Sequence, residues 1–188
     1  MKIAIFCSST HKEKDLYTSK CLDLIDELAR HENQIIYGGS KSGLMGIIAD
    51  RGLEHNLQVH GVITKDLSSK ESEHKNLTSL VLTENMSQRK YKMYELSDAF
   101  IILPGGTGTM DEFFEIYTLC QLGYQNKPIL IYNILGFYDK LLDFLDGMVE
   151  NNFLDKRFKD MLIIEDNPKN VYELLENYKA PRAKWSKE

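Results

Sequence analysis

Several features that define common protein classes are scarce in this chain of 188 residues. It has three cysteines, Cys7, Cys21 and Cys120, which lie far apart and form no CxxC pair. Such an odd and sparse set argues against a disulfide framework and indicates reduced thiols in a cytoplasm. The apolar run near the N-terminus, Ile3–Cys7, is too short for a signal peptide or a membrane span. We therefore expect a cytoplasmic protein with no membrane partner.

Basic charge and metal-binding motifs are scarce as well. Lys and Arg together number 23 against 28 Asp and Glu, which gives a net charge of −5. Because a protein that coats nucleic acid needs a basic face, nucleic acid is not an expected partner, although a small anion needs only a few local donors. The five histidines include no i,i+4 pair and no HExxH motif, so no metal is expected.

What the chain does contain is a regular alternation of two patterns. Short apolar runs rich in Ile, Val and Leu are continuous rather than alternating, which is typical of strands buried on both faces of a parallel sheet. The strands expected on this basis are Lys2–Cys7, Gln34–Tyr37, Val59–Ile63, Leu80–Leu82, Ala99–Leu103, Ile129–Tyr132 and Leu162–Ile164. Longer stretches with apolar residues at helical spacing predict helices. These helices are Asp15–Arg30, Leu44–Asn56, Ser87–Ser97, Thr109–Leu122, Phe137–Glu150 and Asn170–Tyr178.

This alternation of strand and helix predicts an α/β fold with a doubly wound, Rossmann-like parallel sheet. The length fits one domain. We assign residues 1–180 to that single domain and residues 181–188, which contain proline and lysine, to a loose tail. Ligands of such sheets bind beyond the carboxyl ends of the strands, where loops lead into helices. The loops at those ends are Ser8–Lys14, Gly38–Gly46, Thr64–Ser79 and Pro104–Met110.

Two of these loops are rich in glycine. The first, YGGSKSGLMG at Tyr37–Gly46, has Gly38, Gly39 and Ser40 at its start, and the second is PGGTGTMDE at Pro104–Glu112. The second loop offers amides and hydroxyls from Gly105, Gly106, Thr107, Gly108 and Thr109. A single Gly-Gly pair is more often a plain turn, but two such loops, each opening a helix, favour a phosphate site at a helix N-terminus. Neither loop matches the P-loop or the dinucleotide GxGxxG register, so NAD is not expected.

Charged residues stand beside both glycine-rich loops. A carboxylate in a first helical turn complements the helix dipole; this interpretation suits Asp111 and is open for Glu112 as well. If the second loop holds a phosphate, Glu112 would instead lie near the sugar of a nucleotide. In MSQRKYKM, Arg89 and Lys90 stand in a first turn, where positive charge opposes the dipole. A solvated basic face is the ordinary interpretation of such a run. A residue placed against a local preference is nevertheless a candidate for function, and an arginine can hold a phosphate or a carboxylate through two parallel hydrogen bonds.

Together these segments resemble the LONELY GUY family of phosphoribohydrolases, whose members were once widely labelled possible lysine decarboxylases. The family signature PGGxGTxxE is met in full by Pro104–Glu112, GGGxxGLMG is met by the first glycine-rich loop, and MHxRK is met by Met86–Lys90. The resemblance covers most of the chain. The sequence departs from the family pattern at Ser40, at Ser87 and, relative to plant members, at Thr107. These positions bear on the choice of base.

The resemblance implies hydrolysis of a nucleoside 5′-monophosphate to the free base and ribose 5-phosphate, with AMP or an N6-substituted AMP, such as a cytokinin riboside monophosphate, as substrate. The family's catalytic arginine and glutamate correspond to Arg89 and Glu112. The role of Glu112 stays open between nucleophile, base and electrostatic stabiliser. The expected substrate-binding residues are Gly38, Gly39, Ser40, Glu71, Lys90, Gly105, Gly106, Thr107, Gly108, Thr109, Met110, Asp111 and Thr118. No cofactor is expected. The resemblance also implies a homodimer with the site near its interface.

Two other functions are alternatives to this one. A non-catalytic nucleotide or cofactor carrier, resembling the molybdenum-cofactor carrier proteins that share this fold, would bind tightly without forming product and would not depend on Glu112. A lysine decarboxylase would need pyridoxal phosphate on a pocket lysine such as Lys41 or Lys90. We rank the decarboxylase last, because nothing in the sequence supplies a partner for the pyridinium nitrogen.

Overall fold

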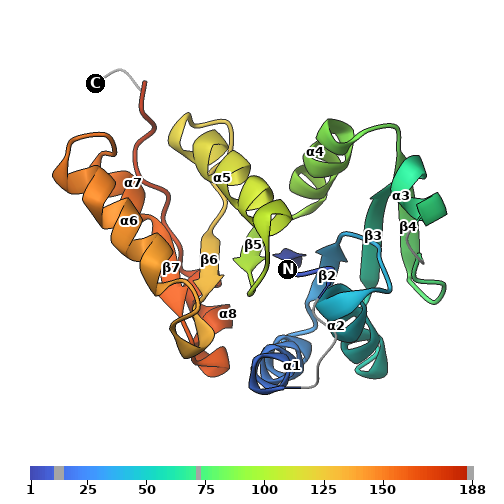
Figure 1. Cartoon of the computed structure of the whole chain (residues 1–188). Helices are drawn as coiled ribbons and strands as arrows, with labels where there is room; N and C mark the ends of the chain where they lie inside the picture. Colours follow the sequence, from blue (N-terminus) through green and yellow to red (C-terminus); the bar gives the residue numbers. More distant parts are fainter. Residues whose placement is uncertain (11–14, 71–72, 186–188) are drawn as a thin grey trace.

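A parallel sheet of seven strands forms the centre of the structure, a computed structural model that describes residues 1–10, 15–70 and 73–185 (Figure 1). The strands are β1 (Lys2–Phe6), β2 (Gln34–Tyr37), β3 (Val59–Thr64), β4 (Ser79–Thr83), β5 (Ala99–Ile102), β6 (Ile129–Tyr132) and β7 (Leu162–Glu165). Their order is β4-β3-β2-β1-β5-β6-β7, and every neighbouring pair is parallel. The predicted doubly wound parallel sheet is therefore confirmed.

Helices cover both faces of this sheet. They are α1 (Leu16–Ala29), α2 (Gly43–Glu54), α3 (Lys65–Lys70), α4 (Met86–Leu96), α5 (Thr107–Gln121), α6 (Asp139–Glu150), α7 (Lys156–Asp160) and α8 (Pro168–Glu176), with a 3-10 turn at Ile134–Gly136. Helices α1, α2 and α8 lie on one face and α4 to α7 on the other, while the short α3 contacts β3 and β4 (Figure 1). Within the described residues, no helix combines the length and apolarity that a membrane crossing requires.

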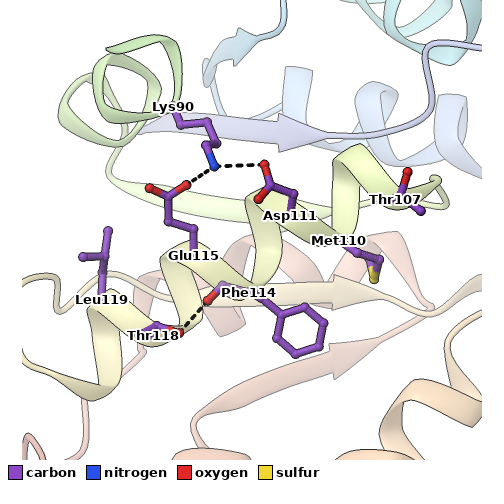
Figure 2. A pocket seen from close by; sticks show the side chains of 8 residues that line it. All are labelled: Lys90, Thr107, Met110, Asp111, Phe114, Glu115, Thr118 and Leu119. Carbon is purple, nitrogen blue, oxygen red and sulfur yellow. Dashed lines mark hydrogen bonds and ion pairs between the residues drawn. The ribbon is translucent and has the colours of Figure 1, made fainter. Parts of the chain in front are cut away.

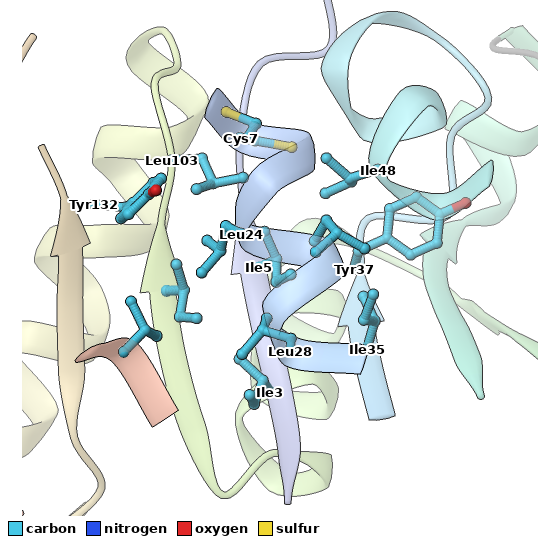
Figure 3. Packing of buried hydrophobic residues seen from close by; sticks show 14 of the residues in the cluster. Ile3, Ile5, Cys7, Leu24, Leu28, Ile35, Tyr37, Ile48, Leu103 and Tyr132 are labelled. Atoms are coloured by element: carbon cyan, nitrogen blue, oxygen red, sulfur yellow. The ribbon is translucent and has the colours of Figure 1, made fainter. Parts of the chain in front are cut away.

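The inner strands have continuous apolar runs because each of them contributes side chains to two hydrophobic cores, one on each face of the sheet. Ile3 and Ile5 of β1 pack on the side of α1, together with Leu24 and Leu28 of that helix (Figure 3). Phe6, on the opposite side of the strand, belongs to the second core under α4 and α5. Successive side chains of a strand point to opposite faces, so a strand buried on both faces has no polar positions. Each fully buried aliphatic or aromatic side chain contributes about 1.5–3 kcal/mol of hydrophobic stabilisation.

The expected helices and strands agree with the structure to within two residues at either end. Two short helices, α3 and α7, and the 3-10 turn were not predicted, because elements of three to six residues are too short to display a helical period. The predicted loose tail begins with a contact to the domain, since the N–H of Lys184 donates to the carbonyl of Gln121 at 2.9 Å. Residues 186–188 lie outside the described residues, and the boundary at residue 181 stays a prediction.

The strand order reverses between β1 and β5. The chain moves outward from β1 through β2 and β3 to β4, and α4 then returns it to β5 at the other side of β1. Loops that diverge at such a switch point leave a crevice beyond the strand ends. Here the loops are tied together, because the N–H of Ser8 donates to the carbonyl of Pro104 at 3.2 Å and the N–H of Leu103 to that of Phe6 at 2.9 Å. The second glycine-rich loop therefore lies at the switch point.

We expect central and edge strands to differ in their tolerance of a truncated isoleucine. Ile101 of β5 is fully buried, whereas Ile164 of β7 is 39% exposed. Ile101→Ala should lower the free energy of unfolding by about 2–5 kcal/mol, because it leaves a cavity in the core. The matched change Ile164→Ala should cost about 1 kcal/mol or less. Urea unfolding measures both values, and equal costs would contradict the central position of β5.

Candidate active site

Arg89 enters the interior of the protein from the first turn of α4. This helix begins after Asn85, whose side chain caps it by accepting from the N–H of Gln88 at 2.9 Å. Arg89 is only 7% exposed. Its Nε donates to the carbonyl of Val62 at 2.9 Å, and its Nη2 donates to the carbonyl of Gly38 at 3.4 Å. The guanidinium is therefore held near the carboxyl ends of β2 and β3, and not on the solvated face that a basic run ordinarily forms.

Glu112 meets this guanidinium from α5. Phe113, Ile116 and Tyr117 of the same helix are buried in the core, and their contacts fix the rotation of the helix about its axis. That rotation turns Glu112 inward, where it is 8% exposed. Nη1 of Arg89 donates to Oε1 of Glu112 at 3.3 Å. The two residues predicted as a catalytic pair are thus in direct contact.

Burial controls the protonation of Glu112. Withdrawal of the carboxylate from water raises the pKa of Glu112 from its ordinary value of 4.5 to about 7. Arg89 lowers this pKa and Asp111 raises it, but burial is the largest effect. A carboxyl group of this kind can give and take a proton near neutral pH. Such a perturbed pKa beside a cavity marks a candidate functional site.

A cavity of about 340 Å³ opens beside this pair, and we call it the Glu112 cavity. Its lining residues are Cys7, Ser8, Ser9, Thr10, Gly38, Met45, Leu67, Met86, Arg89, Gly106, Thr107, Gly108, Thr109, Asp111 and Glu112. The volume lies in the range of small-molecule sites, and the mixture of hydroxyls, amides and apolar side chains is typical of them. Within the described part of the chain, no group of three or more His, Cys, Asp or Glu is arranged to hold a metal ion.

The first turn of α5 forms one wall of this cavity. Gly106 is the N-cap residue and provides no side-chain cap, so the amides at the start of the helix have no acceptor within the helix. A Cβ atom added at Gly106 or at Gly108 would meet nothing within 4 Å. The fold itself therefore leaves open space next to these two residues. Bare amides, the positive end of a helix dipole and open space are what an anion requires.

The predicted binding residues of the first glycine-rich loop divide between the cavity and the region behind it. Gly38 lines the cavity, and a Cβ there would lie 2.2 Å from Nη2 of Arg89, so only glycine leaves room for the guanidinium. Gly39 lies outside the lining, and Ser40 is fully buried with its hydroxyl engaged inside the turn. Gly105 also lies outside the lining.

A second, open groove of about 660 Å³ runs along the outer side of α5 (Figure 2), and we call it the Phe114 groove. Its residues are Lys90, Thr107, Met110, Asp111, Phe114, Glu115, Thr118 and Leu119. Nζ of Lys90 donates to Oδ2 of Asp111 at 2.9 Å and also pairs with Glu115. Thr107 and Asp111 line the groove and the Glu112 cavity alike. Three predicted substrate-binding residues therefore lie in this groove and outside the Glu112 cavity: Lys90, Met110 and Thr118.

Of the three positions that depart from the family pattern, one lines the Glu112 cavity. That residue is Thr107, whereas Ser87 is exposed on α4 and Ser40 is buried in its turn. If these departures alter the choice of base, Thr107 is therefore the residue placed to do so by direct contact. Glu71, the remaining predicted binding residue, lies outside the described residues.

Some lining residues were not singled out from the sequence. Leu67 belongs to α3, in a segment expected to be a loop. Met45 and Met86 belong to the motifs already described, but an apolar residue in a motif does not by itself indicate contact with a ligand. Ser9 and Thr10 lie in the loop after β1. Because this loop follows the carboxyl end of a strand, its position could have identified both residues as candidates for the lining.

The fold and the cavity place this chain among the α/β proteins that have a Rossmann-like sheet and a ligand-sized cavity at its switch point. The family model described as "Possible lysine decarboxylase" matches residues 45–175. Relatives named as phosphoribohydrolases match nearly the whole chain at about 34–36% identity. The chain therefore belongs to the LONELY GUY family, the former possible lysine decarboxylases.

Individual relatives give the extent of the similarity. A probable cytokinin riboside 5′-monophosphate phosphoribohydrolase of Oryza sativa subsp. japonica is 34% identical, over 97% of this chain and 75% of its own. A cytokinin riboside 5′-monophosphate phosphoribohydrolase of Arabidopsis thaliana is 36% identical, over 94% of this chain and 82% of its own. The solved structure of a molybdenum cofactor carrier protein from Chlamydomonas reinhardtii matches with a TM-score of 0.69 at 15% identity, over 94% and 96% of the two chains. This last likeness concerns the fold alone.

The raised pKa of Glu112 predicts a specific dependence of stability on pH. Between about pH 4.5 and pH 7 the folded protein holds a proton on Glu112 that the unfolded chain releases, so the stability of the wild type should fall as pH rises through this window. Glu112→Gln removes the titrating group. The stability of Glu112→Gln relative to the wild type should therefore increase across the window, as measured by urea unfolding at several pH values. A difference that stays constant with pH would contradict the raised pKa.

Proposed function

We propose that this protein hydrolyses the N-glycosidic bond of a nucleoside 5′-monophosphate, AMP or an N6-substituted AMP, to the free base and ribose 5-phosphate. The observation that carries the proposal is the buried contact of Nη1 of Arg89 with Oε1 of Glu112, at 3.3 Å on the wall of a ligand-sized cavity. The names of the relatives, which are phosphoribohydrolases of cytokinin riboside 5′-monophosphates, support the same reaction.

The phosphate of the substrate would bind at the first turn of α5. The amides of Thr107, Gly108 and Thr109 precede the first hydrogen bond of that helix, which Met110 makes to Gly106 at 3.1 Å. The chain as a whole is acidic, so attraction of the phosphate has to come from these local donors and from the helix dipole. A phosphate there would leave the ribose between α5 and Arg89, beside Glu112.

The reaction would build positive charge on the ribose as the bond from C1′ to the base nitrogen breaks. The oxygen of a water molecule forms the new bond to C1′, and one proton of that water passes to the departing base. A carboxylate beside C1′ stabilises the oxocarbenium-like state. Since the pKa of Glu112 is about 7, the same carboxyl group can accept a proton from the water. Arg89 would orient the carboxylate and favour its ionised form.

The two competing functions fit the site less well. A carrier of the molybdenum-cofactor type needs the fold and the anion site but no buried carboxyl group at the cavity. A decarboxylase needs a lysine in the cavity to hold pyridoxal phosphate. Lys90 is instead paired with Asp111 and Glu115 in the Phe114 groove, and Lys41 is exposed on the first glycine-rich loop. The lining of the Glu112 cavity includes neither lysine.

We expect Glu112→Gln to reduce the release of adenine from AMP by a factor of about 10²–10³ or more, because it removes the charge that stabilises the ribose cation. Binding of AMP should persist, since the amides of α5 are unchanged. Glu115→Gln is the matched control: it removes a carboxylate one turn further along α5, in the Phe114 groove, and should change the rate only slightly. Chromatographic detection of adenine and calorimetry of AMP binding measure the two quantities.

Two outcomes would argue against this assignment. Full activity of Glu112→Gln would contradict the role given to this carboxyl group. Tight binding of AMP by the wild type without any release of adenine, or of base from an N6-substituted AMP, would favour the carrier.

We further propose that two copies of the chain associate over the Phe114 groove. Met110, Phe114 and Leu119 give this groove an apolar floor, and Phe114 is 36% exposed. Exposed apolar surface rimmed by charged residues is typical of an interface. Since Thr107 and Asp111 line both the groove and the Glu112 cavity, a partner copy seated there would lie next to the site.

Phe114→Arg should convert the dimer to a monomer, because it places a charge in the apolar floor of the groove. The matched control is Phe153→Arg, since Phe153 is 86% exposed in the turn between α6 and α7 and should tolerate the charge without a change of mass. Light scattering coupled to size-exclusion chromatography measures the mass of each protein. A dimeric Phe114→Arg variant, or a monomeric wild type, would contradict the proposed interface.

A further inference from the structure

His74 is a buried histidine outside the lining of the Glu112 cavity, and both of its ring nitrogens are engaged. It is 3% exposed and lies between α3 and β4. Nε2 lies 2.9 Å from Oδ1 of Asp50 on α2, and the backbone N–H of Asn76 donates to Nδ1 at 3.3 Å. Because Nδ1 accepts a hydrogen bond, the ring proton lies on Nε2, which donates to Asp50.

The segment around His74 is bound to the first glycine-rich turn. The backbone N–H of His74 donates to the carbonyl of Gly39 at 3.1 Å, and the preceding residue, Glu73, pairs with Ser40 as an antiparallel bridge. Gly39 has a φ of +76°, a conformation that glycine adopts without strain. The bond from His74 to Asp50 therefore anchors the backbone segment that holds this turn in place.

The same turn holds Arg89. The carbonyl of Gly38 accepts from Nη2 of Arg89 at 3.4 Å, and a Cβ on residue 38 would lie 2.2 Å from that nitrogen. The turn and the guanidinium are thus in direct contact, and Nη1 of the same guanidinium donates to Glu112. A hydrogen bond that is already 3.4 Å long has little room to lengthen before it is lost. A displaced turn would therefore change how Arg89 meets Glu112.

We propose that His74, anchored by Asp50, is a positioning residue for the Arg89–Glu112 pair. It acts through the turn at Gly38 and Gly39 and touches neither the substrate nor the reacting atoms. The kinetic part of this inference rests on the proposed hydrolysis, whereas the effect on Arg89 does not. A histidine that only stabilised the fold would change the fraction of folded protein but not the rate of each folded molecule.

His74→Ala should lower kcat for base release by about 10–100-fold with little change in KM, because small displacements of catalytic groups have effects of this size. Asp50→Ala should act in the same direction. Asp50→Asn keeps an acceptor for Nε2–H and should stay close to wild type, and His74→Gln, whose amide can donate to Asp50, should recover part of the loss. If His74→Ala does not fold, Asp50→Ala carries the test, because the side chain of Asp50 is 56% exposed.

A second histidine–aspartate pair provides a matched control. Nε2 of His55, at the C-terminal end of α2, lies 2.8 Å from Oδ1 of Asp26 on α1. The glycine-rich turn precedes the opposite, N-terminal end of α2. His55→Ala should therefore affect stability alone and leave kcat per folded molecule within about twofold of wild type.

The Nε–H resonance of Arg89 in ¹H–¹⁵N spectra, assigned with Arg89→Lys, reports the guanidinium directly and needs no substrate. His74→Ala or Asp50→Ala should shift this resonance, and His55→Ala should not. An unchanged resonance together with an unchanged kcat in the folded variant would overturn the inference. If the wild type released no base but the resonance still shifted, the proposed hydrolysis would fail and the positioning role of His74 would stand.

Discussion

The contact between Arg89 and Glu112 is the interaction on which the rest of the site depends. Both side chains are about nine-tenths buried, and removal of either one would leave the other in the interior without its partner of opposite charge. Arg89 also donates hydrogen bonds to two backbone carbonyls, those of Val62 and Gly38, in addition to the one to the carboxylate. The absence of a side chain at Gly38 and the inward rotation of Glu112 on α5 follow from the same requirement.

The sheet topology explains how residues so far apart in the chain meet. All strands run in one direction, so the loops that follow β1, β2, β3 and β5 lie at one edge of the sheet. The chain reverses its order between β1 and β5, which opens the crevice. Helices α4 and α5 then bring Arg89 and Glu112 together over the strand ends. The outer face of α5 carries the Phe114 groove, and Thr107 and Asp111 join the two regions.

Much of this arrangement could be predicted from the sequence, because strands buried on both faces and glycines that open helices leave local patterns. The sequence motifs identify Arg89 and Glu112 as candidate site residues. The contact between their side chains depends on how two helices pack, and no local sequence pattern encodes that packing. The short helix that supplies Leu67 was missed for want of a helical period. Thr118, which the resemblance implies at the substrate, lies in the Phe114 groove, and its contact with substrate stays a prediction. At roughly 100° per residue, six residues beyond Glu112 place it on a different face of α5.

In the proposed reaction, Glu112 stands beside C1′ of a ribose whose phosphate lies on the first turn of α5. The most direct test is a crystal structure of Glu112→Gln with AMP bound. We expect the phosphate oxygens to lie about 2.7–3.2 Å from the amide nitrogens of Thr107 to Thr109. The side chain of residue 112 should lie about 3–4 Å from C1′. AMP bound with its phosphate away from α5, or with C1′ well out of reach of residue 112, would contradict this arrangement.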